Sequence, residues 1–89
     1  MANALRLEGD VTIYRAAELK RVLLDAVDHP GALEVDLSGV TELDTAGVQL
    51  LLLAQRAATA KKKQIRLAAH STAVVEVLGL LHLGLEDLR

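Results

Sequence analysis

Apolar and polar residues alternate in two short stretches near the start of the chain, residues 4–8 and 11–13, which flank Gly9 and Asp10. Alternation with a period of two is typical of a strand that buries one face. A pair containing glycine between two such stretches favours a tight turn. The pattern therefore predicts two short strands that are joined at Gly9 and Asp10.

The period changes to that of a helix over residues 13–28, where apolar positions recur at spacings of three and four. Thr12 precedes this stretch and is a candidate N-cap. Pro30 and Gly31 follow it, and proline disfavours helical geometry at the residue before it. The sequence thus predicts a helix over 13–28 whose inward face carries Leu19, Val22, Leu23 and Ala26.

Residues 33–37 alternate strictly and have the length of a strand. Three apolar residues would share one face, and the acids Glu34 and Asp36 would share the other. An acidic face predicts a sheet with one side open to solvent rather than covered on both sides. Ser38 and Gly39 then favour a turn.

A second helix is predicted from Asp44 or Thr45, either of which can act as its N-cap, to about Ala60. Its sequence is apolar almost all round, which predicts the most buried helix of the domain. A narrow polar stripe begins at Thr45, and at least one of Leu52 and Leu53 is expected to lie exposed beside it. The other members of this stripe are Gln49, Arg56 and Thr59.

The rest of the chain predicts one more strand over 65–68 and a third helix over 72–82, capped by Ser71 or Thr72. Gly79 would weaken that helix by up to ~1 kcal/mol relative to alanine, and close packing against a neighbour is one reason for a glycine there. Residues 83–89 are either a tail or a last short strand.

The predicted order of elements is β-β-α-β-α-β-α in a single domain over residues 1–89. Strands that alternate with helices are typical of an α/β fold with parallel pairing through right-handed crossovers. We expect one core that contains Val35, Leu50, Leu51, Ala54, Val74 and Leu78.

The composition of the chain limits the kinds of core, site and location that it can have. Hydrophobic residues make up 52% of the chain, but Tyr14 is its single aromatic residue, so the core must be aliphatic. The chain contains no cysteine, which excludes disulfides, thiolate nucleophiles and cysteine-based zinc sites. No signal-like segment and no apolar run of membrane-spanning length is visible, so we expect a cytoplasmic protein without direct membrane insertion.

Charges are interleaved, and the net charge is −2. The single run of like charge is Lys61–Lys63, which we interpret as a helix end, since cations there complement the helix dipole. Nucleic-acid binding is not expected, because the chain offers neither a basic surface nor an aromatic platform for stacking bases.

The side chains that could do chemistry form no recognisable constellation. The histidines share no metal-ligand spacing, and the serines lie in no nucleophile elbow: His29, His70, His82, Ser38 and Ser71. The glycines are scattered and form no phosphate-binding loop. The acids Glu34 and Asp36 fit a solvated strand face better than acid–base catalysis. We therefore expect no catalytic residue, no metal and no cofactor, and a binding protein rather than an enzyme.

The segment from Leu33 to Leu51 resembles the core motif of STAS domains, the sulfate-transporter and anti-sigma-factor-antagonist family. In that motif a strand with an Asp-Leu-Ser-like end, here Asp36–Ser38, leads to a hydrophobic residue, Asp, Ser or Thr, a small residue and Gly, here Leu43–Gly47. A hydrophobic helix follows. The resemblance covers nearly the whole chain and implies a STAS-like fold, with a mixed sheet of four to five strands and about three helices mainly on one face.

The resemblance also implies a role in partner switching. In stand-alone bacterial members the start of the second helix docks on a partner, often an anti-sigma factor that is also a kinase, and phosphorylation there releases the partner. Such members often read Asp-Ser-Ser-Gly, with the second Ser phosphorylated. This chain has Ala46 in that slot, which leaves Thr45 as the candidate switch residue. The implied partner-binding residues are Asp44, Thr45, Ala46, Gly47 and Gln49.

An Asp-Thr-small-Gly sequence is also similar to the STAS subunit of lipid-asymmetry ABC transporters, where the Thr lies at the contact with the ATPase, and to STAS proteins of chemotaxis clusters. Two kinds of partner therefore stay open: an anti-sigma factor or kinase-like regulator, and a transporter ATPase. The domain itself is expected to be a monomer or a weak dimer.

Overall fold

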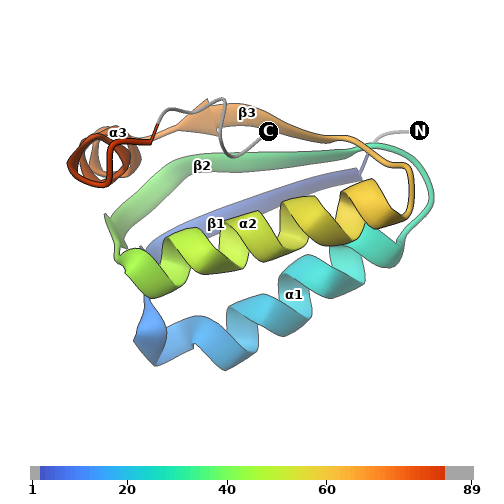
Figure 1. Cartoon of the computed structure of the whole chain (residues 1–89), viewed down its shortest axis with the longest axis horizontal. Coiled ribbons are helices and arrows are strands. Elements are labelled where there is room, and N and C mark those ends of the chain that lie inside the picture. The colour runs from blue at the N-terminus through green and yellow to red at the C-terminus, as the bar shows by residue number, and fades with distance from the viewer. Residues whose placement is uncertain (1–2, 84–89) are drawn as a thin grey trace.

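A computed structural model describes residues 3–83 of the chain as three strands that alternate with three helices (Figure 1). The strands form one sheet in the order β1-β2-β3, and both pairings are parallel. Helices α1 and α2 run alongside each other on one side of the sheet, and α3 packs against β2 near its end. The elements are β1 (Asn3–Val11), the 3-10 turn η1 (Ile13–Arg15), α1 (Ala16–Asp28), β2 (Leu33–Leu43), α2 (Thr45–Ala60), β3 (Ile65–His70) and α3 (Thr72–Leu80).

The α/β class and the three helices are confirmed, but the strand count differs from the expectation. Within residues 3–83 the sheet has three strands, all parallel, rather than a mixed set of four or five. The last short strand was expected in residues 83–89; Leu83 is not in a strand, and residues 84–89 lie outside the described part.

The predicted hairpin at Gly9 and Asp10 is wrong. The chain continues as the single strand β1, and Gly9 takes a left-handed φ of +76° without reversing direction. β1 instead pairs with β2 along its whole length, from Asn3 opposite Leu33 to Val11 opposite Leu43. Long-range pairing therefore overrides a local sequence that is typical of a turn.

The predicted turn at Ser38 and Gly39 is also wrong, because β2 runs through it to Leu43. Twice in this half of the pairing β2 uses one residue more than β1, once between residues 36 and 39 and once between residues 40 and 42. The buried positions after Leu37 are accordingly Val40 and Leu43, three residues apart rather than two. Such bulges bend a strand and increase its twist.

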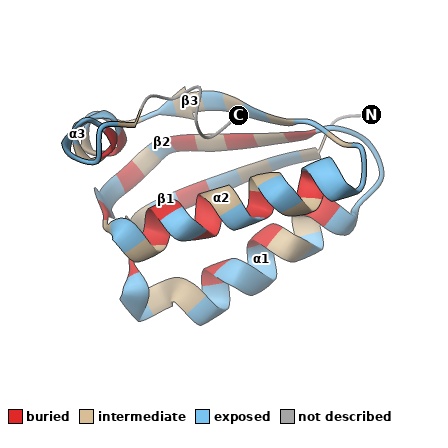
Figure 2. Ribbon diagram, in the orientation of Figure 1, coloured by how far each residue is buried: buried red, intermediate tan, exposed pale blue. Residues whose placement is uncertain are grey.

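One aliphatic core lies between the sheet and the helices, and buried positions of α1 and α2 face the strands (Figure 2). The opposite face of the sheet carries the half-buried acids Glu34 and Asp36, and Arg66 of β3 lies 3.6 Å from Glu34 there. The prediction of a polar outer face is thus confirmed. All six residues expected in the core belong to it: Val35, Leu50, Leu51, Ala54, Val74 and Leu78.

The first helix begins later than predicted. Residues 13–15 form the 3-10 turn η1, and α1 starts at Ala16. Thr12 does not cap a helix, since its hydroxyl donates to Asp10 Oδ2 at 2.6 Å. Val22, expected to point inward, is exposed. The predicted end of the helix at Asp28 is confirmed.

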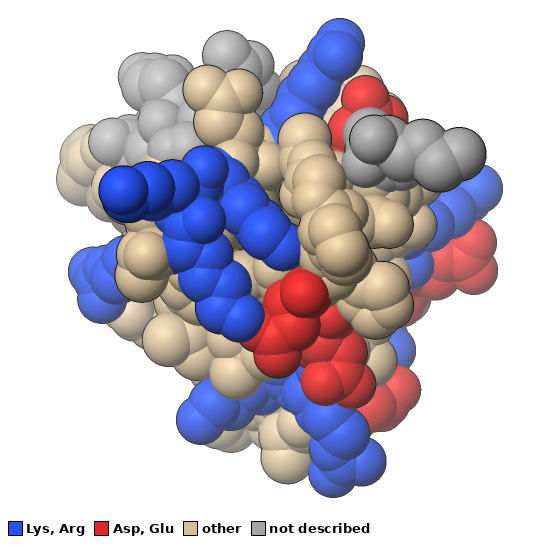
Figure 3. All heavy atoms as spheres, turned by 90° about the vertical axis from the view of Figure 1, so that its right-hand side faces the viewer, with Lys and Arg blue, Asp and Glu red and all other residues tan. Residues whose placement is uncertain are grey.

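The lysine run lies at the C-terminal ends of two helices, in agreement with its interpretation as a helix end. Lys62 has a left-handed φ of +59°, and the backbone N–H of Lys63 donates to Ala58 O at 2.8 Å, which terminates α2. The Lys63 ammonium also donates to Val27 O at 2.6 Å, at the end of α1. Lys61 pairs with Asp28. Figure 3 shows basic side chains gathered beside acidic ones on this face.

Close packing against a described residue does not account for Gly79, because a Cβ at this position would meet no atom of residues 3–83 outside its own helix backbone within 4 Å. None of the helices in the described part of the chain is both long and apolar enough to cross a membrane.

Candidate functional site

The start of α2 is fixed by the side chain of Asp44, which is its N-cap. Asp44 Oδ1 accepts a hydrogen bond from Gly47 N at 2.8 Å, and Oδ2 accepts one from Ile13 N at 3.0 Å. Both bonds favour the ionised carboxylate, so the Ile13 and Gly47 N–H groups hold the pKa of Asp44 below its ordinary value. Of the two N-caps that the sequence allows, Asp44 is the one used.

Gly47 lets α2 sit directly on the end of β1. A Cβ at this position would lie 2.0 Å from Val11 O and 2.8 Å from Leu43 Cδ1, which are distances that real contacts do not reach. Gly47 is also buried. Gly47, although it is one of the predicted partner-binding residues, therefore supports the site from beneath and does not reach the surface.

The remaining predicted site residues reach the surface. Thr45 and Gln49 are exposed, and Asp44 and Ala46 are half-buried. Leu53 is exposed one turn after Gln49, and positions four apart share one face of a helix. Leu52 packs against the core. The expectation that one of the two leucines lies exposed is confirmed.

Two further exposed residues lie beside this helix start, and the sequence interpretation missed them. Ile13 is 61% exposed and Tyr14 is 92% exposed. They belong to η1, which the hydrogen bond from Ile13 N to Asp44 ties to the start of α2. The composition of the chain could have indicated Tyr14, because it is the single aromatic residue and has no place in the predicted aliphatic core.

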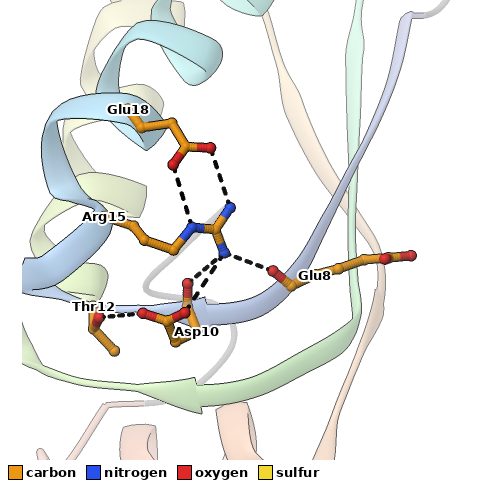
Figure 4. Close-up of polar contacts among 5 residues, drawn as sticks. All are labelled: Glu8, Asp10, Thr12, Arg15 and Glu18. Atoms are coloured by element: carbon orange, nitrogen blue, oxygen red, sulfur yellow. Dashed lines mark hydrogen bonds and ion pairs between the residues drawn. The ribbon is translucent and has the colours of Figure 1, made fainter.

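Arg15 attaches η1 to the end of β1 (Figure 4). Its Nη1 donates to the carbonyl oxygens of Glu8 and Asp10, both at 2.8 Å. The guanidinium also lies 3.5 Å from the Glu18 carboxylate, in the first turn of α1. One half-buried side chain thus connects β1, η1 and α1.

Residues 10–18 and 42–49 build the surface around the start of α2, here called the docking edge, and both segments are acidic. They carry four carboxylates, those of Asp10, Glu18, Glu42 and Asp44, against one guanidinium. Asp10 and Glu42 are neighbours across the β1–β2 pairing. The backbone N–H groups at the start of α2 supply partial positive charge, but Asp44 already accepts from one of them.

Among residues 3–83 no group of three histidine or acidic side chains could hold a metal. Ser38 donates its hydroxyl to Asp36 Oδ1 at 2.6 Å and has no histidine partner in that contact. A hollow of about 680 Å³ lies at the other end of α2, lined by side chains from Gln55 to Leu67.

A family model described as "Mlab, STAS domain" matches residues 2–88. The chain belongs to the STAS domain family. This match confirms the resemblance carried by the segment from Leu33 to Leu51 and covers almost the full length of the chain. STAS domains are generally non-catalytic modules that bind other proteins and act in regulation, in agreement with the surface described above.

Proposed function

We propose that this STAS domain is a regulatory binding module that docks on its partner through the start of α2, with Thr45 at the centre of the contact. One observation carries the proposal: Asp44, and not Thr45, caps the helix. Thr45 is exposed and is not needed for the cap, so its hydroxyl is free to meet a partner at the helix start.

A partner switch is the form of regulation that this surface supports best. The exposed hydroxyl of Thr45 is accessible to a kinase, whereas Ala46 has none to modify. A phosphate on Thr45 would add about −1.5 to −2 charges. The helix dipole would favour it by ~0.3–1 kcal/mol, and the nearby acids would oppose it by a similar amount, so the fold would tolerate it.

The interface would respond much more strongly than the fold. A dianion buried in a contact without a cation loses its hydration, which costs several kcal/mol. A loss of about 3–5 kcal/mol corresponds to an affinity lower by roughly 10²- to 10⁴-fold. Thr45→Glu, as a partial mimic of the phosphate, should therefore remain folded and lose its partner.

The test begins with capture of the partner from the native lysate by the tagged full chain and its identification by mass spectrometry. Affinities of purified variants for that protein then follow. Thr45→Ala and Thr45→Ser should keep most of the binding. Thr72→Glu is the matched control, because Thr72 is also the exposed first residue of a helix, α3, after a capping Ser71. If Thr45→Glu binds like the parent, the docking site lies elsewhere.

A second candidate is the accessory subunit of a lipid-asymmetry ABC transporter, which would dock by the same surface on the ATPase. The sequence Asp44-Thr45-Ala46-Gly47 favours it, because this form resembles those subunits and lacks the usual acceptor serine. The identity of the captured protein separates the candidates: a kinase-like regulator supports the switch, and an ATPase supports the transporter role. Phosphorylated Thr45 in native protein would support the first.

A further inference from the structure

The most exposed large side chain of the docking edge is Tyr14, the only aromatic residue in the protein. The core around it is entirely aliphatic, and yet the one aromatic ring is 92% exposed. Ile13, next to it, is 61% exposed. Single exposed apolar residues are ordinary on protein surfaces, but an adjacent pair at the rim of a docking edge is an unusual concentration of apolar area.

The backbone that carries this pair is held from both sides. Ile13 N donates to Asp44 Oδ2 at 3.0 Å, so the capping carboxylate of α2 also holds η1. On the other side, Arg15 donates to the carbonyl oxygens of Glu8 and Asp10 (Figure 4). A side chain presented from a restrained backbone loses less entropy on binding, which favours affinity.

The surroundings of the pair indicate the chemistry of what would cover it. The segments 10–18 and 42–49 hold four carboxylates and one guanidinium, and part of the Asp10 charge is already met by Arg15 at 3.9 Å. A complementary surface would be cationic. A second copy of this chain that met it through the same surface would bring like charges together, and an anionic lipid surface would be repelled, so a basic protein surface fits best.

We infer that Ile13 and Tyr14 form an apolar anchor that enters a pocket, rimmed by lysine or arginine side chains, on the same protein that docks on Thr45. This inference rests on the proposed function and extends it from a helix start to a two-part surface. Tyrosine is enriched among the residues that dominate binding energy at interfaces, because its ring is large and rigid and its hydroxyl stays paired.

Photo-crosslinking in the native cell tests the position and captures the partner in the same step. The probe is p-benzoylphenylalanine, placed at residue 14, at residue 45 or, as a control, at residue 80. Leu80 is also a highly exposed apolar residue, on α3, which lies on the opposite side of β2 from η1 (Figure 1). The same protein should be joined to residues 14 and 45, and not to residue 80.

The partner that crosslinking identifies is then purified on its own, and its affinity for full-length variants of this chain is measured. Tyr14→Ala should weaken binding by about 30-fold or more, as for a central interface residue, at an unchanged melting temperature. Tyr14→Phe should keep most of the affinity, and Leu80→Ala all of it. Glu42→Gln should weaken binding and reduce its salt dependence, whereas Glu76→Gln, on α3, should do neither.

The outcomes separate the inference from the proposal beneath it. A partner that crosslinks at 45 but not at 14, or binding that falls with Thr45→Glu and not with Tyr14→Ala, overturns the anchor and leaves the docking role of α2 intact. If no protein is crosslinked to residue 45, both the apolar anchor and the proposed docking role of α2 are overturned. An adduct at 14 with a second copy of the chain, or with lipid alone, also overturns the anchor. Binding that is independent of salt overturns the cationic rim.

Discussion

The carboxylate of Asp44 joins Ile13, 31 positions earlier in the chain, to the start of α2. Its Oδ2 accepts from Ile13 N at 3.0 Å while its Oδ1 accepts from Gly47 N at 2.8 Å. One side chain thus sets the positions of both parts of the proposed docking surface. The residue that the sequence identifies as a simple cap has a second, long-range role.

This arrangement predicts a particular pH dependence. Hydrogen bonds from Ile13 N and Gly47 N lower the pKa of Asp44 in the folded protein. The stability they contribute is therefore present above the unfolded pKa, about 3.9, and is lost as the pH falls through the lower folded pKa. Denaturant unfolding of the parent and of Asp44→Asn from pH 2 to 7 should show a difference that shrinks at the acidic end.

Asp36 supplies the control for that experiment. Its pKa is also lowered, by hydrogen bonds from the Ser38 hydroxyl and the Ser38 N–H, but it lies on the outer face of the sheet. Asp36→Asn should show the same sign of pH dependence while partner affinity at neutral pH is retained. A stability difference for Asp44→Asn that grows toward acid would contradict the assigned role of the cap.

Gly47→Ala should destabilise the domain by about 1–3 kcal/mol, the usual range for an added methyl group in a packed site. The reason is steric, since the new Cβ would lie 2.0 Å from Val11 O and backbone must move to make room. Thermal or denaturant unfolding measures the loss. The same displacement should shift Thr45 and weaken the partner complex; parental stability would mean that α2 does not sit on β1 as described.

Gly79→Ala, the other substitution of a helical glycine, should have the opposite sign. A Cβ there meets no described residue outside its own helix backbone within 4 Å, and alanine restricts the unfolded chain. We expect a gain of about 0.5–1 kcal/mol, which for a domain of this size raises the melting temperature by roughly 2–8 °C. A decrease would show that α3 is covered at this position by another part of the protein or by a partner.

Gln49→Glu tests the extent of the contact along α2. Gln49 is exposed one turn after Thr45, so a charge there should leave the melting temperature nearly unchanged. If the interface extends along this face, the acid should weaken the complex by placing a charge in its centre. Gln64→Glu, exposed beyond the far end of α2, serves as the comparison. Equal affinities for both variants would confine the contact to the helix start.

Local pattern predicted those parts of the fold in which local and long-range forces agree. The apolar face of α2 and the alternation of Leu33–Leu37 indicated the core correctly, because each element buries one continuous face. Gly9 and Ser38 misled the interpretation, since glycine and serine favour turns locally while pairing between β1 and β2 holds both segments extended.

The candidate site was predicted only in part, for a related reason. Asp44 and Thr45 could be found because an N-cap is a local signal and because they match a family motif. Ile13 and Tyr14 could not, because their exposure depends on where η1 settles, and this is decided by Arg15 and Asp44. Periodicity alone places residues 13–15 inside the first helix and so assigns them no separate role.

The two extra residues in β2 decide which of its later side chains reach the core. In a regular strand, residues an odd number of positions apart lie on opposite faces, so Leu37 and Val40 would point to opposite sides of the sheet without an extra residue between them. Each bulge takes up one residue, and Val40 and Leu43 therefore stay in the core with Leu37. The residue that precedes Asp44 thus faces the core because of two irregularities in the backbone rather than because of any single side chain.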